Sequence, residues 1–274
     1  MHSLTRANGD MALFSEAGAT LFDRSPRSVT FTPTPTFDAA TRGAVVLVDG
    51  APLAAGSSTG VIAGLLRLRD DIATTYQSQL DETARGLAQA FVETDSSGVA
   101  PDALGLFQAP GLTAPPAVGA ATGFAAVISI AAAIDPEQGG DPALERGGGV
   151  AGAAYRANAS GASGFSDRLH AIADALARPQ DFAASAQAGV RVSAADYAAS
   201  SVSWVEAARA DAVQAATYSG ALLANVATSL SNATGVNLDD EMAKMLAIEN
   251  SYRATTKLIS TIDSMFQSLL QAVG

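Results

Sequence analysis

Residues 237–274 read NLDDEMAKMLAIENSYRATTKLISTIDSMFQSLLQAVG, and this stretch decides the expected fold. Its apolar residues recur at steps of three and four, which keeps one face of a helix turned toward a partner helix. Asn237 and Asp240 predict a capped helix start, and the acidic residues there suit the positive end of the helix dipole. The predicted helix is about 55 Å long, from a rise of about 1.5 Å per residue.

The apolar face of this helix forms one continuous seam. The seam consists of Leu238, Met242, Met245, Ile248, Tyr252, Thr255, Ile259, Ile262, Phe266, Leu269 and Val273. One pair of successive three-residue steps marks a local register shift, which coiled coils tolerate. We expect the seam to be an assembly surface that is buried against another chain. The alternative is that the long seams of the protein pack on each other inside one self-sufficient helical domain.

Composition favours long, thin helical packing over a thick globular core. Of the 274 residues 48% are apolar, but much of that fraction is alanine and only 6% of residues are aromatic. Alanine favours helix and buries little area. The 27 acidic residues outnumber the 16 basic ones. This balance argues against a nucleic-acid partner, which requires a basic face, and against an anionic membrane surface.

The chain has no cysteine, which excludes disulfides and thiolate chemistry. Residues 1–10 lack the apolar core of a signal peptide. The longest apolar run, 124–134, is too short to span a bilayer, so no membrane insertion is expected. If the protein leaves the cytoplasm, we expect a route without a cleaved signal.

Upstream of the terminal helix, the pattern predicts a small β-rich region followed by helices. Candidate strands are 12–14, 20–22, 28–32, 45–48 and 125–130, with a hairpin turn at Asp49-Gly50. Candidate helices are 61–93, 166–177 and 193–232, the last with a capping box at Ser193 and Asp196. The expected fold class is α+β, mainly α, with long amphipathic, coiled-coil-like helices and a small N-terminal β-rich region.

The helix expected at 61–93 has its own apolar stripe. The stripe consists of Leu65, Leu68, Ile72, Tyr76, Leu80, Ala84, Leu87 and Phe91. The pairs Asp70-Asp71 and Asp81-Glu82 fall largely off this stripe. We therefore expect both acidic pairs to lie on the solvated side of the helix.

The sequence predicts no catalytic, cofactor-binding or metal site. Gly147, Gly149 and Gly152 match G-x-G-x-x-G, but no strand precedes them and no helix follows, so we expect a flexible loop. His2 and His170 have no cysteine and no third histidine to complete a metal set. A Ser–His–acid triad would have to use one of these two histidines, and no G-x-S-x-G elbow is present.

Motifs in the terminal segment carry a family resemblance. N-L-D-D-E-M, S-Y-R-A-T-T-K-L-I-S-T-I-D and M-F-Q-S-L-L, within residues 235–274, resemble the C-terminal signature of bacterial flagellar axial proteins. That family includes rod, hook and hook-associated proteins. Residues 64–98, 196–212 and 9–31 are similar to the first hook-associated protein family (FlgK type).

This resemblance implies a non-enzymatic structural component at the hook–filament junction, outside the cell. The implied partners are the hook protein, the second hook-associated protein, a ring of further copies, and an export chaperone on the C-terminal helix. Export through the flagellar type III apparatus needs no cleaved signal. The alternatives are another axial protein (second hook-associated, hook or rod), or a secreted helical adhesin or enzyme module.

The chain departs from this family at its N-terminal side. It lacks the expected N-terminal helix with an N-I-A-N-type motif and the inserted β-domain of larger members, so we expect the C-terminal portion of a longer protein. The expected division is an incomplete β-rich outer domain (1–55), a helical middle domain (56–234) with a loop-rich insert (99–164), and a C-terminal axial helix (235–274).

Overall fold

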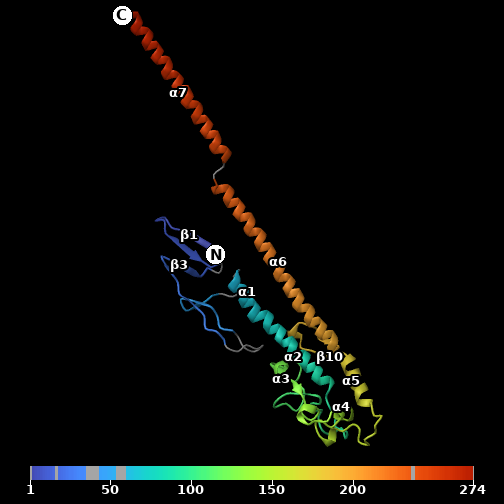
Figure 1. Ribbon diagram of the computed structural model, residues 1–274. Helices are drawn as coiled ribbons and strands as arrows, with labels where there is room; N and C mark the ends of the chain where they lie inside the picture. The colour runs from blue at the N-terminus through green and yellow to red at the C-terminus, as the bar shows by residue number, and fades with distance from the viewer. Residues whose placement is uncertain (1, 16–17, 35–42, 54–59, 236–237, 274) are drawn as a thin grey trace. The chain divides into compact units, whose positions relative to one another are not determined.

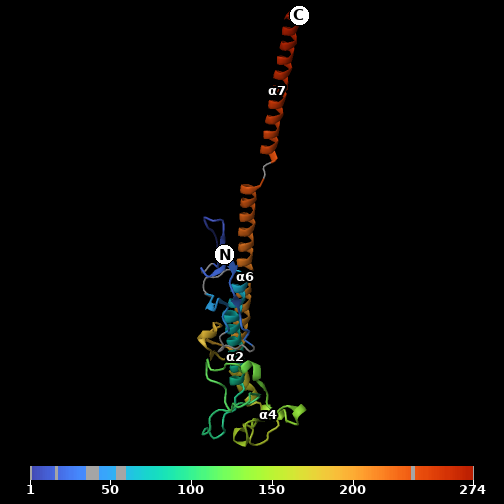
Figure 2. The same ribbon diagram turned by 90° about the vertical axis from the view of Figure 1, so that its left-hand side faces the viewer.

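The computed structural model describes residues 2–15, 18–34, 43–53, 60–235 and 238–273. The chain divides into two compact units, 1–210 and 211–274, and each is described by itself (Figure 1; Figure 2). The protein is α+β and mainly α, with small antiparallel sheets near the N-terminus, which confirms the expected fold class. The three-part division at 55 and 234 stays a prediction.

The first strands form a four-stranded antiparallel sheet in the order β1-β2-β3-β4. Its strands are β1 (His2–Thr5), β2 (Met11–Phe14), β3 (Thr20–Asp23) and β4 (Ser25–Pro26). The predicted strands at 12–14 and 20–22 are confirmed, whereas the sequence pattern does not predict β1 or β4. Ala12 is buried and β1 is exposed along its length, so the sheet contributes little core.

A second antiparallel sheet has the order β5-β6-β7, with strands β5 (Val29–Thr30), β6 (Leu47–Val48) and β7 (Ala51–Pro52). Asp49 and Gly50 join β6 to β7 with φ angles of 50° and 80°. Two successive positive φ angles are what a tight hairpin turn of type I′ needs, so the predicted turn is confirmed. The strands expected at 28–32 and 45–48 are present in shortened form.

The helix expected at 61–93 is interrupted. It consists of α1 (Val61–Arg67), a π-helical turn (Leu68–Ile72) and α2 (Ala73–Ala90). A π-helical turn inserts an extra residue, so a stripe with three-four spacing does not continue through it on one face. Leu65 and Leu68, expected on the buried stripe, are 59% and 50% exposed.

The buried residues of α2 include charged side chains as well as small ones, and the expectation that Asp81 and Glu82 lie on the solvated side is wrong. Each of these residues is only 2% exposed, whereas Leu80 from the expected apolar stripe is 38% exposed. Asp70 and Asp71 are exposed, as expected. The physical reason is that loops lie against these buried residues with backbone N–H groups that need acceptors.

Asp81 organises the segment that follows residue 120. Its carboxylate accepts hydrogen bonds from the N–H groups of Gly123 (2.8 Å) and Ala125 (2.9 Å). These are donors at the start of the short helix α3 (Phe124–Val127), where a negative charge is favourable. The predicted strand at 125–130 is therefore wrong over its first half, and only Ser129–Ile130 (β9) is a strand.

Glu82 holds a second pair of loops. It accepts hydrogen bonds from the N–H of Gly119 (2.8 Å) and the N–H of Ala183 (3.2 Å). Arg85, which is also buried, forms an ion pair with Glu82 at 3.0 Å and donates to the carbonyl of Asp181. Helix α2 thus binds segments that lie 37 and 101 residues from Glu82 in the sequence.

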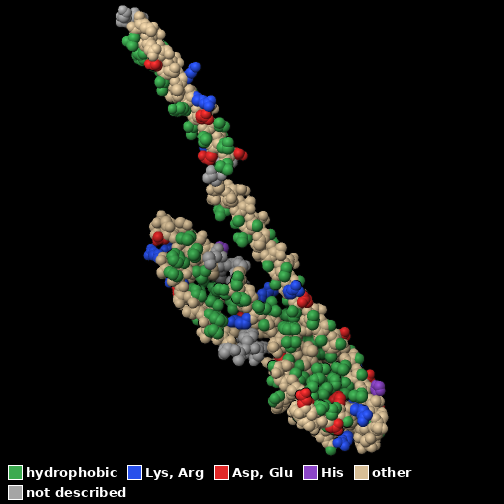
Figure 3. All heavy atoms as spheres, viewed as in Figure 1, with side chains coloured by type: hydrophobic (Ala, Val, Ile, Leu, Met, Phe, Trp, Pro, Cys, Tyr) green, Lys and Arg blue, Asp and Glu red, His purple; other side chains and the backbone are tan. Residues whose placement is uncertain are grey.

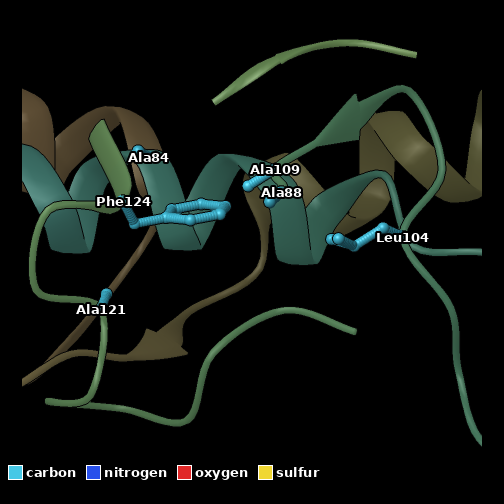
Figure 4. Packing of buried hydrophobic residues seen from close by; sticks show 6 residues of the cluster. All are labelled: Ala84, Ala88, Leu104, Ala109, Ala121 and Phe124. Carbon is cyan, nitrogen blue, oxygen red and sulfur yellow. The ribbon is translucent and has the colours of Figure 1, made fainter. Parts of the chain in front are cut away.

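Small side chains form the apolar core beside these polar contacts. One cluster contains Ala84, Ala88, Leu104, Ala109, Ala121 and Phe124 (Figure 4). A second contains Phe182, Ala188 and Tyr197, with the Phe182 and Tyr197 rings stacked at 3.9 Å. Burial raises the pKa of Tyr197 to about 12.

The loop-rich segment 99–164 has short elements of its own. Besides α3, it contains β8 (Phe107–Gln108), which pairs with β9, the 3₁₀ turns Pro136–Gln138 and Ala153–Tyr155, and helix α4 (Ala143–Gly147). Helix α5 (Asp167–Ala177) confirms the helix expected at 166–177. Strands β10 (Gln180–Asp181) and β11 (Arg191–Val192) then pair around the 3₁₀ turn Ala184–Ala186.

Two long helices complete the chain: α6 (Ala194–Thr234) and α7 (Leu238–Val273). The predicted N-cap at Ser193 is confirmed, whereas the Asp196 carboxylate binds the Ser193 hydroxyl in place of the backbone N–H that a full capping box would use. The Ser193 hydroxyl accepts from the N–H of Asp196 (3.1 Å) and donates to its carboxylate (2.7 Å). In the second unit, residues 211–234 of α6 and all of α7 are helical, apart from a break near Gly235 that the sequence predicts.

Candidate assembly surface

The predicted seam lies along α7, and its described side chains are exposed. The exposed fractions of its hydrophobic side chains from Leu238 to Leu269 run from 50% at Ile262 to 74% at Leu238. Hydrophobic side chains are visible along the length of α7 (Figure 3). The cap residue Asn237 and the side chain of Val273 lie outside the described part of the chain. The helix itself is confirmed, whereas the role of the seam as an assembly surface stays a prediction.

The apolar face is broader in the C-terminal half of α7 than the seam alone suggests. Leu258, Met265 and Leu270 flank the seam and are 63%, 67% and 71% exposed. With 3.6 residues per turn, the apolar side chains from 258 to 270 cover an arc of about 140°. A seam that contacts a single partner helix is narrower than this. The width therefore suits contact with more than one neighbouring helix.

Several of the remaining side chains of α7 bind polar groups of the same helix. Glu249 pairs with Arg253 at 2.7 Å, with the acid four residues before the base, the order that supports a helix. Several hydroxyls donate to the carbonyl four residues earlier, and in Thr255, within the seam, this distance is 2.9 Å. A hydroxyl bonded in this way can enter an apolar contact without leaving its donor unpaired.

The part of α6 in the second unit has a similar character. Between Asp211 and Asp239 the sequence has no charged residue. Leu222, Val226 and Leu230 recur every four residues there and are 52–60% exposed. Small residues, including Gly220, occupy much of the rest of this segment. Exposed apolar side chains in such a row are a candidate surface for contact with another protein.

The glycine motif binds a carboxylate of the chain itself. Glu93, just after α2, is 0% exposed and accepts from the N–H groups of Gly149 (2.9 Å) and Ala151 (2.8 Å). Gly147 ends α4, and no strand precedes the motif, so the dinucleotide-binding context is absent from this described segment. The backbone N–H groups of this loop therefore bind an anion that belongs to the chain itself.

The candidate histidine of the middle region lies on the surface. His170 is exposed on α5. No group of three or more His, Cys, Asp or Glu side chains that could hold a metal ion occurs in the described ranges. Among the helices described, none is both long and apolar enough to cross a membrane.

Sequence comparison points to the same terminal segment. Residues 229–272 match the family described as "Flagellar basal body rod FlgEFG protein C-terminal". No curated protein and no solved structure shows significant similarity to the chain. The matched family is a flagellar structural family and not an enzyme family. The match spans the end of α6 and nearly all of α7, and it indicates a rod- or hook-type structural component of the bacterial flagellum.

Proposed function

We propose that this protein is a first hook-associated protein (FlgK type) that assembles at the junction between flagellar hook and filament. The observation that carries the proposal is the exposed apolar seam of α7, whose members from Leu238 to Leu269 lie inside the residues that match the flagellar family. The resemblance of residues 64–98 and 196–212 to the first hook-associated protein family supports the finer assignment. Assembly proceeds by burial of the seam against helices of neighbouring subunits.

The same seam accounts for the proposed partners. In the flagellum these are the hook protein, the second hook-associated protein and further copies of the chain. Before export, an apolar face of this length must be covered, and an export chaperone that binds α7 would cover it. Export is through the flagellar type III apparatus, without a cleaved signal, to the outside of the cell.

A rod or hook protein is the second candidate, because the matched family is described for basal body rod proteins. Electron microscopy of cells that lack the full gene, with a swimming assay, distinguishes the two. Bare hooks, with flagellin lost to the medium, are expected for a junction protein. Loss of the hook itself would instead assign the chain to the rod or hook. Normal filaments and normal swimming would refute both candidates.

A further inference from the structure

A largely buried cluster of two carboxylates and one guanidinium lies in the first unit. Arg168 of α5 forms ion pairs with Glu93 at 3.6 Å and with Glu145 of α4 at 3.9 Å, both through its Nη2 atom. The side chains of Arg168 and Glu93 are 8% and 0% exposed, and that of Glu145 is 20% exposed. With both acids ionised, the cluster therefore carries two negative charges and one positive charge.

Arg168 also joins three segments through backbone contacts. Its Nε donates to the carbonyl of Glu145 at 2.8 Å, and its Nη1 donates to the carbonyl of Val92 at 3.3 Å. Glu93 in turn binds the N–H groups of the 148–152 loop. The end of α2, helix α4 and this loop are thus attached to α5 through one cluster.

The two carboxylates of the cluster differ in their hydrogen bonding. Each oxygen of Glu93 accepts a backbone N–H. Both oxygens of Glu145 are buried, and no donor among the described residues reaches them. A buried carboxylate without donors is costly in its charged form and comparatively stable when protonated. Glu145 is therefore the member of the cluster that takes up a proton.

The surroundings of Glu145 support this assignment. Burial, the largest cause, and the Glu93 charge raise the pKa of Glu145, and Arg168 opposes them. On α4, the neighbouring Arg146 donates instead to the carbonyl of Ser163. On α5, the remaining charged or titratable side chains, Asp167, His170 and Asp174, are exposed.

We propose that Glu93, Arg168 and Glu145 form a proton-dependent clasp, which holds α4 and the 148–152 loop against the end of α2 more firmly when Glu145 is protonated. At low pH, with Glu145 protonated, the charged members of the cluster are the Glu93 carboxylate and the Arg168 guanidinium. As pH rises above the ordinary value of 4.5, the unfolded chain ionises first and the folded cluster must then take a second negative charge. The clasp therefore weakens with rising pH.

The first test is a carboxyl NMR titration of the full chain, with the Glu145 signal assigned by its loss in Glu145→Gln. The expected midpoint for Glu145 lies above 4.5. A midpoint at or below that value would overturn the proposal. The titration itself is made on the unmodified protein, and the variant serves only to assign the Glu145 signal.

The second test compares thermal unfolding of Glu145→Gln with that of the unmodified chain. The expected midpoint of the variant is higher by about 2–4 °C at about pH 7, with the difference lost at about pH 4. The control is Glu137→Gln, since Glu137 is exposed and outside the cluster. This variant should leave the unfolding midpoint unchanged at both pH values. An equal or lower midpoint at about pH 7, or a difference independent of pH, contradicts the clasp.

Hydrogen exchange locates the effect. At about pH 7 the amides of Gly149 and Ala151, corrected for intrinsic exchange rates, should be at least several-fold better protected in Glu145→Gln than in the unmodified chain. Unchanged protection of these two amides would overturn the proposal even if the unfolding temperature rises.

Discussion

Helices α2 and α7 use their faces in opposite ways. Both have apolar residues at three-four spacing, yet α2 buries Asp81, Glu82 and Arg85, whereas α7 leaves Ile259 and Phe266 more than 60% exposed. On α2, the charged side chains bind loop backbones and one another. On α7, the charged side chains for which contacts are described pair within the helix itself. The same periodicity therefore accompanies a polar intramolecular contact in one region and an uncovered apolar surface in the other.

The difference shows what an apolar stripe establishes. A stripe marks a surface that would gain free energy from burial, but it does not say which partner covers it. On α2, loops rich in glycine and alanine have few large side chains to bury, and their N–H groups require acceptors. Hydrogen bonding therefore helps to select the covered face of α2, beside the apolar contacts of Ala84 and Ala88. The apolar face of α7 stays exposed.

The largest expected effect comes from charge on the seam. Replacing Ile259 and Ile262 by Asp should abolish chaperone capture and assembly, with affinity reduced at least about 100-fold, because each buried unpaired carboxylate costs several kcal/mol. The control is Ser260→Asp with Ser264→Asp, which adds the same charge to the other side of α7. Titration of the purified chaperone measures the effect. Unchanged affinity in the seam variant would remove the seam from the proposed function.

Removal of the Asp81 carboxylate tests the polar contacts of α2. Asp81→Ala leaves the N–H groups of Gly123 and Ala125 without their acceptor, so the free energy of unfolding should fall by about 2–5 kcal/mol. Asp71→Ala, at an exposed position on the same helical run, should change it by less than about 0.5 kcal/mol. Urea unfolding followed by circular dichroism measures both. Equal effects would show that burial of Asp81 does not determine the packing of α2.

One substitution should have opposite signs in the two units. A Cβ at Gly86 on α2 would lie 2.8 Å from Cε1 of Phe182, so Gly86→Ala should destabilise by about 1–3 kcal/mol. At Gly220 on α6 nothing described lies within 4 Å, so Gly220→Ala should stabilise the helix by about 0.5–1 kcal/mol. Thermal unfolding of both variants measures the two effects. A stabilising Gly86→Ala would contradict close packing on α2.

The smallest effect is a pH dependence at Asp95, in the loop after α2. The N–H of Ala100, then the hydroxyl and N–H of Ser97, hold the pKa of Asp95 well below its usual range. A lowered folded pKa gives stability that is present above the ordinary value of 3.8 and lost as pH falls. Asp95→Asn should therefore be less stable than the unmodified chain at about pH 7, and this difference should shrink in acid. A pH-independent difference would exclude ionisation as the cause.

The sequence predicted the elements whose signals are local. The N-cap at Ser193, the Asp49-Gly50 turn and the helices α5, α6 and α7 each depend on residues close together in the chain. The polar contacts of α2 could not be predicted in this way, because the donors that bind Glu82 come from residues 119 and 183. The π-helical turn at 68–72 has no distinctive local signal, and it changes which residues of the helix share a face.

By itself, the sequence determined the long helices, their apolar seam and the flagellar resemblance of the terminal segment. Each of these features depends on residues that follow one another in the chain. Only the tertiary structure decided which side of α2 is buried, and that the glycine motif is occupied by Glu93. Both outcomes depend on contacts between segments that are distant in the sequence. In these contacts, backbone N–H groups that need an acceptor bind a carboxylate whose burial the apolar periodicity does not predict.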